Sequence, residues 1–233
     1  MKKLSFLVAL VMISLSALAQ TTVKLPAPDK QVAMTLYEAL QTRHSVRSYQ
    51  NKDVDNATLA QVLWAACGYS REAEKKITAA SALNRQDIEV YVIKAAGAYR
   101  YDVESNALVQ LSGKDLRREV AAGQQSVASA PVMLVLASNQ GKFGSLGDAL
   151  AAQRLGTLDA GYVSQNIYLA CTALKLGTVA RATMNVEVLK KELGLGADHL
   201  LLLNHPIGWE ESKYKLNDKT NKDEKDQNSM LDK

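Results

Sequence analysis

The sequence predicts one domain that mixes helices and strands, and three patterns support this fold class. Residues 88–95 alternate in a β-rich run and residues 131–137 form a continuous apolar run, as expected of buried strands. The stretch 148–176 has the length and apolar content of a helix that packs in a core or a subunit interface, although Asp159, Gln165 and Asn166 are embedded in it. A chain of 233 residues is long enough for one core of ordinary size.

The other elements follow from local sequence signals. A short helix is expected at 35–42 with Leu36, Ala39 and Leu40 facing inward, and a second helix is expected to begin at Asn56 as its N-cap and to end at Gly68. The remaining expectations are a charged loop at 71–76, a hairpin of 99–103 and 108–111, helices at 115–122 and 187–193, an extended segment at 178–183, and a strand at 200–204 that closes at Pro206.

The N-terminus has the pattern of a secretory signal peptide. Two lysines precede an apolar run from Leu4 to Leu15, and Ala17 to Ala19 form an A-x-A cleavage site, so residues 1–19 are expected to be removed and 20–33 to form an extended arm. The apolar run is too short for a stable membrane span. A buried N-terminal strand is the alternative. Residues 210–233 are charged and are expected to form a disordered tail.

Composition excludes several classes of function. Removing Lys2 and Lys3 lowers the formal net charge from +4 to +2, which is too small to indicate nucleic-acid binding. No Cys/His cluster has the spacing of a metal site. Cys67 and Cys171 lie in apolar helical contexts, which favours buried free thiols, although an exported protein could also join them in a disulfide.

The segment Arg43-His44-Ser45-Val46-Arg47 carries the first candidate binding residues. In an extended chain, side chains alternate between faces, so Arg43, Ser45 and Arg47 would share one face. Two guanidinium groups and a hydroxyl on one face suit a phosphate dianion, because arginine binds phosphate in a bidentate manner. A solvated basic turn is the alternative.

Three further segments bring polar groups or glycine to the ends of predicted elements. They are 79–86 before a strand, Gly123-Gln124-Gln125 before the next strand, and 176–181 where the long helix gives way to an extended chain. Their short amide and hydroxyl groups can bind the edge of an amide-rich ring, and glycine permits close approach of the backbone to a ligand. Each segment read singly also fits ordinary loop or helix-cap chemistry.

Taken in order, the four segments resemble the nitroreductase family of FMN-dependent oxidoreductases over residues 34–209. Arg43, Ser45 and Arg47 match the family's R-x-S-x-R segment. The family's P-S-x-x-N-x-Q loop is matched by Ser81, Asn84 and Gln86, with Ala80 in place of its proline. Within the family the chain most resembles the subgroup related to the dehydrogenases of peptide-azole biosynthesis.

The resemblance implies an α+β, three-layer fold with a central mixed sheet flanked by helices, built as an intertwined homodimer with FMN at the subunit interface. Arg43, Ser45 and Arg47 would come from one subunit and hold the phosphate, and Ser81, Asn84 and Gln86 would reach the flavin, Ser81 and Asn84 from the other subunit. The candidates near the pyrimidine edge of the flavin are Gln124, Arg181 and the backbone at Ala180, and Lys213 or Lys215 is a candidate for the phosphate.

The activity implied is ping-pong hydride transfer through bound FMN to a small organic acceptor of nitro or quinone type, with NAD(P)H as a candidate donor and no side chain serving as catalytic acid or base. Two alternatives stay open: a flavin-dependent dehydrogenase of a peptide or small molecule, and a flavin-binding protein without turnover. NAD(P)H is a cytoplasmic donor, so export to the periplasm favours reduction by a periplasmic redox partner or by the substrate.

Export can be checked directly. N-terminal sequencing of the native protein is expected to begin at Gln20, because cleavage follows the small residue at Ala19. A native chain that begins at Met1 would contradict the prediction.

Overall fold

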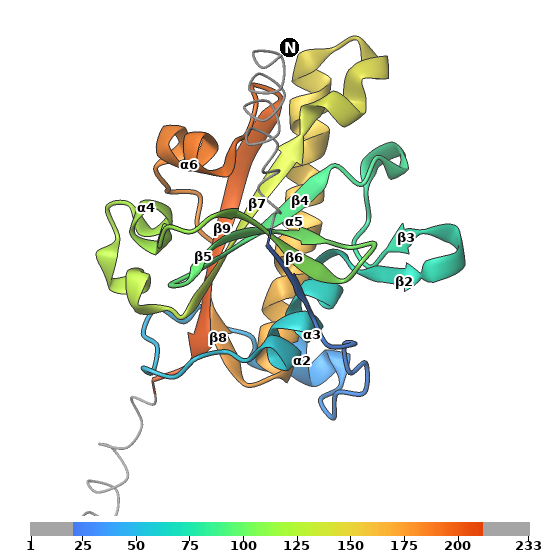
Figure 1. The fold of residues 1–233 in the computed structure, drawn as a ribbon. Helices are drawn as coiled ribbons and strands as arrows, with labels where there is room; N and C mark the ends of the chain where they lie inside the picture. The colour runs from blue at the N-terminus through green and yellow to red at the C-terminus, as the bar shows by residue number, and fades with distance from the viewer. Residues whose placement is uncertain (1–20, 212–233) are drawn as a thin grey trace, which may run out of the picture.

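The computed structural model describes residues 21–211, which form one central sheet with helices on both faces (Figure 1). The expected signal peptide, and the expected tail beyond residue 211, lie outside the described residues. Among residues 21–211 no helix is long and apolar enough to cross a membrane, and no group of three metal-ligating side chains occurs.

The central sheet has seven strands in the order β1-β6-β5-β4-β7-β9-β8. Its strands are β1 (Thr22–Lys24), β4 (Ile88–Lys94), β5 (Gly97–Asp102), β6 (Ala107–Ser112), β7 (Val132–Asn139), β8 (Leu176–Thr178) and β9 (His199–Trp209). The α+β class with a central sheet flanked by helices is confirmed. Within the described residues the sheet is antiparallel rather than mixed, because short turns join β4 to β5 and β5 to β6.

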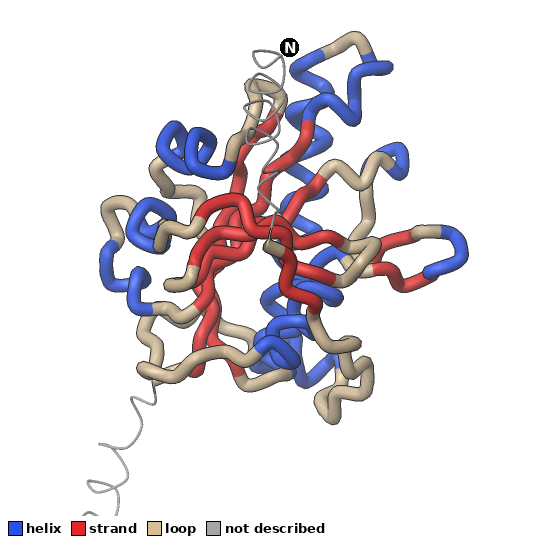
Figure 2. The backbone as a smooth tube through the Cα atoms, in the orientation of Figure 1, coloured by secondary structure: helices blue, strands red, loops and turns tan. Residues whose placement is uncertain are grey.

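The helices and the smaller sheet lie around this centre (Figure 2). The helices are α2 (Leu36–Thr42), α3 (Asn56–Cys67), α4 (Arg117–Ala121), α5 (Ala149–Ala173) and α6 (Val186–Leu193), and the short 3₁₀ turns are η1 (Glu72–Glu74), η2 (Ala82–Asn84), η3 (Gln125–Ser129) and η4 (Gln140–Leu146). β2 (Tyr69–Arg71) and β3 (Lys76–Ile77) form a two-stranded sheet.

Each face of the central sheet has its own core. Successive side chains of a strand point to opposite faces, so Val90 and Val92 of β4 join one core while Tyr91 and Ile93 join the other. The first core packs against α3 and α5, and the second packs against α4 and α6. Cys67 and Cys171 are buried as free thiols in the first core, which confirms that prediction.

Five local expectations were wrong, and two of them concern helix starts and helix faces. Asp55, not Asn56, is the N-cap of α3, because its carboxylate accepts the backbone N–H of Thr58. Leu36 and Leu40 of α2 are exposed by 61% and 47%, and only Ala39 of this helix is buried. The outer face of α2 is therefore apolar and open.

The other three concern boundaries. The expected charged loop at 71–76 is the β2–β3 hairpin around η1. Helix α5 ends at Ala173 rather than 176, because Leu176 already pairs with Trp209 in the sheet. Strand β9 continues through Pro206 to Trp209, since β7 pairs with it on one side and β8 on the other.

Helix α5 lies close against the sheet because Gly156 has no side chain. A Cβ at Gly156 would lie 2.2 Å from Ser138 Oγ of β7 and 2.9 Å from Gln140 Nε2. On the outer face of the same helix, a Cβ at Gly161 would meet no atom within 4 Å. The packing of α5 on the sheet therefore requires glycine at position 156 but not at position 161.

This difference gives a matched pair of variants. Gly156→Ala is expected to lower the free energy of unfolding by about 1–3 kcal/mol, because overpacking forces the helix away from β7. Gly161→Ala is expected to be neutral or to stabilise by up to about 1 kcal/mol, since alanine is the better helix former. Urea unfolding measures both, and equal midpoints for the two variants would contradict this account.

Candidate functional site

The segment 43–47 lies along the edge strand β8. The backbone N–H of Val46 donates to the carbonyl of Thr178 over 2.9 Å. The Val46 side chain is buried against Gly177, where an added Cβ would lie 2.5 Å from Val46 Cγ1. Tyr49 then bridges to Glu210 beyond the end of β9. The sheet edge therefore fixes the backbone of this segment.

Ser45 and Arg47 are exposed, Arg43 is half-buried and Val46 is buried, but His44 is exposed as well, so the expected alternation holds at Val46 and not at His44. Within residues 21–211, neither Arg43 nor Arg47 forms an ion pair. The guanidinium carbon of Arg43 lies 4.9 Å from the centre of the Tyr168 ring, a cation–π arrangement that orients the group. Two cations are thus available beside one exposed hydroxyl.

Tyr168 of α5 joins this segment to the chain after β8. Its hydroxyl oxygen accepts the backbone N–H of Ala180 over 2.8 Å and lies 3.1 Å from Ser45 Oγ. With its oxygen already accepting from Ala180, Tyr168 can give its own proton to Ser45, which leaves the Ser45 hydroxyl proton free for a ligand. The backbone N–H of Ala180, which is a predicted donor to the flavin, already donates to the Tyr168 hydroxyl within the protein.

His205 of β9 supports Tyr168 from beneath. The two rings meet edge to face with centroids 5.4 Å apart. The His205 imidazole is fully buried, and its nitrogens lie 2.8 Å from Ser164 Oγ and 3.1 Å from Thr178 Oγ1. Burial lowers the pKa of His205 to about 3, so the ring is neutral near pH 7.

Arg181, a predicted candidate for the pyrimidine edge of the flavin, is engaged within the protein. It is buried, and its Nε donates to Gln124 Oε1 over 2.8 Å while its two NH groups donate to Asn204 Oδ1 and to the carbonyls of Val120 and Ala121. These four bonds use most of its five donors. In this structure Arg181 positions the side chain of Gln124, which replaces the direct contact with a flavin that was predicted for Arg181.

The arrangement leaves Gln124 partly free. Its carbonyl oxygen is held by Arg181, so the side-chain NH₂ group points away from that bond, and it has no hydrogen-bond partner in the described part of the chain. Gln124 is exposed. Among the described residues of this predicted group, Gln124 is the exposed one, and both hydrogens of its NH₂ group remain unused.

The predicted loop 81–86 lies elsewhere and is held by Asp159 of α5. Ser81 Oγ and the backbone N–H of Ala82 donate to the Asp159 carboxylate over 3.0 Å and 2.8 Å. Ser81 Oγ also accepts the backbone N–H of Gln86 over 2.7 Å. The Gln86 amide donates to the carbonyl of Lys75 over 2.8 Å, and the Asn84 side chain is exposed. Asn84 is therefore the predicted loop residue most open to a ligand.

A second buried carboxyl group lies beside Asp159. Asp87, which precedes β4, is fully buried, and the Ser138 hydroxyl donates to its Oδ2. Burial raises the pKa of Asp87 to about 6, and the adjoining carboxyl of Asp159 acts in the same direction. Asp87 Oδ1 is buried without a hydrogen-bond partner among the described residues.

The two groups of candidate residues are attached to opposite flanks of α5. Asp159 and Tyr168 are nine residues apart, about two and a half helical turns, so their side chains leave the helix in opposite directions. Figure 1 shows the corresponding separation, with the segment after α2 at the bottom and the loop after β3 at the upper right. The segment 43–47 and the loop 81–86 therefore lie apart from each other within the chain.

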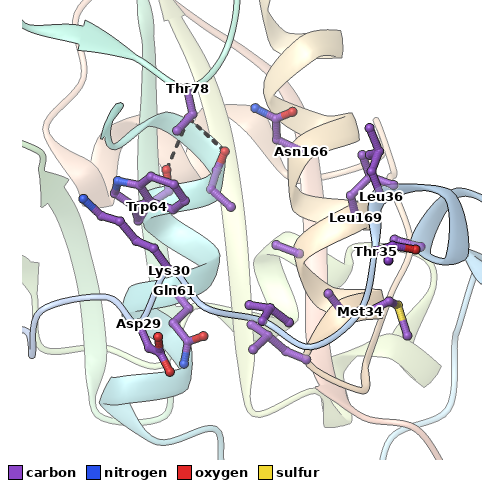
Figure 3. Close-up of a pocket in the computed structure, with 16 residues that line it drawn as sticks. Asp29, Lys30, Met34, Thr35, Leu36, Gln61, Trp64, Thr78, Asn166 and Leu169 are labelled. Carbon is purple, nitrogen blue, oxygen red and sulfur yellow. Dashed lines mark hydrogen bonds between the residues drawn. The ribbon is translucent and has the colours of Figure 1, made fainter. Parts of the chain in front are cut away.

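An apolar cavity of about 340 Å³ lies between α2, α3 and α5 and contains none of the predicted residues (Figure 3). Leu36, Trp64 and Leu169 line it from these three helices. The Thr78 hydroxyl at its wall is occupied by the carbonyls of Trp64 and Ala65. Its walls are mainly apolar, with polar side chains contributed by Asp29, Gln61 and Asn166.

Three residues of the site were not found from the sequence: Tyr168, His205 and Asp87. Tyr168 lies in an apolar helix pattern, and His205 lies in a strand, so neither had a local signal. Asp159 did have one, since it is an acidic residue inside a helix that is apolar on most faces. Such a residue indicates a specific partner, because an unpaired buried charge is costly.

Comparisons with known proteins agree on one family. The model of the nitroreductase family matches residues 40–209. A "putative nitroreductase" of Methanocaldococcus jannaschii is 29% identical over 80% of this chain and 96% of its own length. A solved structure of a "putative nitroreductase" from Ralstonia eutropha JMP134 is 31% identical with a TM-score of 0.76, covering 82% of this chain and 90% of that one. A nitroreductase family protein from Clostridium novyi NT shares the fold at 18% identity, with a TM-score of 0.58 over 78% of this chain and 88% of its own.

The buried imidazole predicts a pH dependence of stability. The folded-state pKa of His205 lies below its ordinary value of 6.5, so below pH 6.5 the unfolded state binds more protons and stability falls as the pH is lowered toward 3. His205→Asn removes this contribution, and the difference in unfolding free energy between wild type and variant is expected to change by up to about 1.4 kcal/mol per pH unit. Denaturant unfolding between pH 4 and 7.5 measures it. Parallel pH profiles for the two proteins would show that His205 does not titrate on unfolding.

Proposed function

The chain belongs to the nitroreductase family, and from that premise we propose that it is an FMN-dependent oxidoreductase that reduces small organic acceptors of nitro or quinone type. The observation that carries this proposal is the pair of arginines, Arg43 and Arg47, that flank the exposed Ser45 hydroxyl and lack an acidic partner in the described part of the chain. A phosphate dianion would complete this group.

The fit to a phosphate rests on preorganisation. Arg43 is held over the Tyr168 ring, and the backbone of the segment is tied to β8 by the bond from Val46 to Thr178. A hydroxyl and two guanidinium groups can donate to three phosphate oxygens, and charge-assisted bonds of this kind are about twice as strong as neutral ones. Lys213 and Lys215, the other candidates for the phosphate, lie outside the described residues.

The ring of FMN would lie between the phosphate half-site and a loop 81–86. Bound FMN would supply the hydride transfer, first from a donor and then to an acceptor. Gln124 would donate its free NH₂ group to an acceptor on the ring, with Arg181 fixing the orientation of its amide. Ser81 and Gln86 keep the loop closed through their mutual hydrogen bond, which leaves the exposed Asn84 as the polar group nearest to a ligand.

We propose that the enzyme is a homodimer whose two flavin sites each combine half-sites from both chains. Opposite flanks of α5 carry the two half-sites, so a second chain is needed to bring them together. The exposed apolar side chains of α2 and α5 supply a surface for that chain. Leu36, Tyr37, Leu40, Leu158 and Tyr162 are exposed by 61%, 83%, 47%, 57% and 49%. We assign the apolar cavity beside Leu36 to the same interface rather than to the flavin.

We also propose that the chain belongs to the subgroup related to the peptide-azole dehydrogenases and that it is exported. If the leader directs export, the donor in the periplasm would be a redox protein or the substrate itself rather than free NAD(P)H. No described residue favours a second class of function over this one.

The phosphate assignment is tested by truncating the arginines. Arg43→Ala and Arg47→Ala are each expected to weaken FMN binding about 10- to 150-fold, because losing one charge-assisted bond costs roughly 1.5–3 kcal/mol. Arg154→Ala, an exposed arginine of α5, serves as the control and should leave the affinity unchanged. Titration of apo-protein with FMN measures all three. Full affinity in both segment variants would refute the assignment.

The reaction type is tested by anaerobic spectroscopy of the purified holo-protein. Its photoreduced form is expected to be reoxidised by a quinone or nitroaromatic compound faster than free reduced FMN at the same concentration, because the protein positions the acceptor. NADH and NADPH are expected to reduce it slowly. Reoxidation no faster than that of free FMN would favour a flavin carrier. Rapid reduction by micromolar NAD(P)H in a protein located in the cytoplasm would contradict the proposed donor.

A further inference from the structure

The loop 81–86 has a strained backbone that needs an anchor. Leu83, Asn84 and Gln86 have φ angles of +53°, +53° and +48°, in the left-handed region that side chains disfavour. Leu83 is also 63% exposed, so apolar packing does not hold it there. Such a conformation persists only where the surroundings determine it. The anchor must therefore be polar.

Asp159 supplies that anchor and must act as a hydrogen-bond acceptor. The Ser81 hydroxyl and the N–H of Ala82 both donate to its carboxylate, and Ala82 reaches both oxygens, at 2.8 Å and 3.1 Å. Asp159 is only 2% exposed, so water does not compete for these bonds. Two donors on one carboxyl group hold the start of the loop against α5.

Asp87 places a second carboxyl group against this anchor. It is buried, its Oδ2 is taken by the Ser138 hydroxyl, and its Oδ1 has no donor among the described residues although the side chain contacts that of Asp159. Two ionised carboxylates cannot bond to each other, since both only accept. A proton on Asp87 Oδ1 would remove the clash of charges and give this atom a partner on Asp159.

No cation among residues 21–211 neutralises the pair. On η4, Gln140 bonds to Ser138, and the Lys142 ammonium donates to the carbonyl of Gln86. In the loop, Arg85 donates to the Ser145 hydroxyl. On β4, the Glu89 carboxylate accepts from Tyr91 and from Asn139 of β7.

We propose that Asp87 and Asp159 share one proton, carried by Asp87, and that this buried acid pair is a pH-sensitive latch that holds the loop 81–86 closed. When the proton leaves to solvent, two negative charges face each other in a buried site, and the loop opens because opening lets water reach them. Asp87 and Asp159 are then positioning residues that act on the flavin only through Ser81, Ala82 and Gln86. The link to the flavin rests on the proposed function, whereas the latch itself does not.

The direction of the pH effect follows from the raised pKa of Asp87. Closed loops bind the extra proton and open loops do not, so closure is most favoured below the ordinary value of 3.8 and is weakened as the pH rises to about 6. Above about pH 7 both forms are deprotonated and closure changes no further. The two pKa values differ by about 2 units, which corresponds to roughly a 100-fold change in the opening equilibrium.

Hydrogen exchange of the flavin-free protein tests the latch. The amides of Ala82 and Gln86 are bonded to Asp159 and Ser81, so they exchange when the loop opens. After correction for the intrinsic rate, their protection is expected to fall roughly 30-fold between pH 4 and pH 6 and to level off above about pH 7. A flat wild-type profile would overturn the proposal without the need for any variant.

Two substitutions complete the test. Asp87→Asn mimics the protonated acid, because its NH₂ can donate to Asp159, and its protection is expected to stay high and independent of pH. Asp148→Asn changes a carboxylate at the N-cap of the same helix and is expected to keep the wild-type profile. A wild-type fall in Asp87→Asn would overturn the proposal. FMN titration of the same samples reports separately on the proposed function, since absent flavin binding leaves the exchange result unaffected.

Discussion

The close contact between α5 and the sheet is the constraint on which the rest of the structure depends. The helix has 25 residues, and Gly156 lets its backbone approach Ser138 without a side chain between them. This approach brings Asp159 to Asp87 on one flank and Tyr168 to His205 on the other. A helix placed farther out would lose both polar contacts at once, and with them the anchors of both half-sites.

The two flanks of α5 differ in where their charged groups lie. Around Tyr168 the fully buried His205 is uncharged near pH 7, and the charges lie nearer the surface on Arg43 and Arg47. Around Asp159 the charge is buried and its neighbour is an acid. The first flank is suited to holding an anion at any pH above the pKa of His205, and the second is suited to a response to pH.

Sequence patterns predicted the parts of the fold that depend on local periodicity. The alternation in 88–95 predicted β4 to within one residue, whereas the alternation predicted for 43–47 holds only at the buried Val46, because His44 is exposed together with Ser45 and Arg47. The outward direction of Leu36 and Leu40 was not predictable in this way, because an amphipathic stripe does not tell which surface will cover it.

Contacts between distant segments were also beyond local reasoning. Asp87 and Asp159 lie far apart in the chain, and only the packing of α5 on the sheet brings them together. Arg181 looked like a free donor, yet Val120, Ala121 and Asn204 occupy its guanidinium group. A family resemblance can indicate that such residues belong to a site, but their partners come from the tertiary structure.

The central claim is that each flavin site joins half-sites from two chains, and mixed dimers test it most directly. One chain would carry Arg43→Ala with Arg47→Ala, and the other Ser81→Ala with Asn84→Ala, so neither homodimer keeps an intact site. If the half-sites are shared between chains, the heterodimer has one intact site and binds about one FMN per dimer with wild-type affinity. If each site lies within one chain, the heterodimer has none, and the absence of any tight FMN binding would contradict the account.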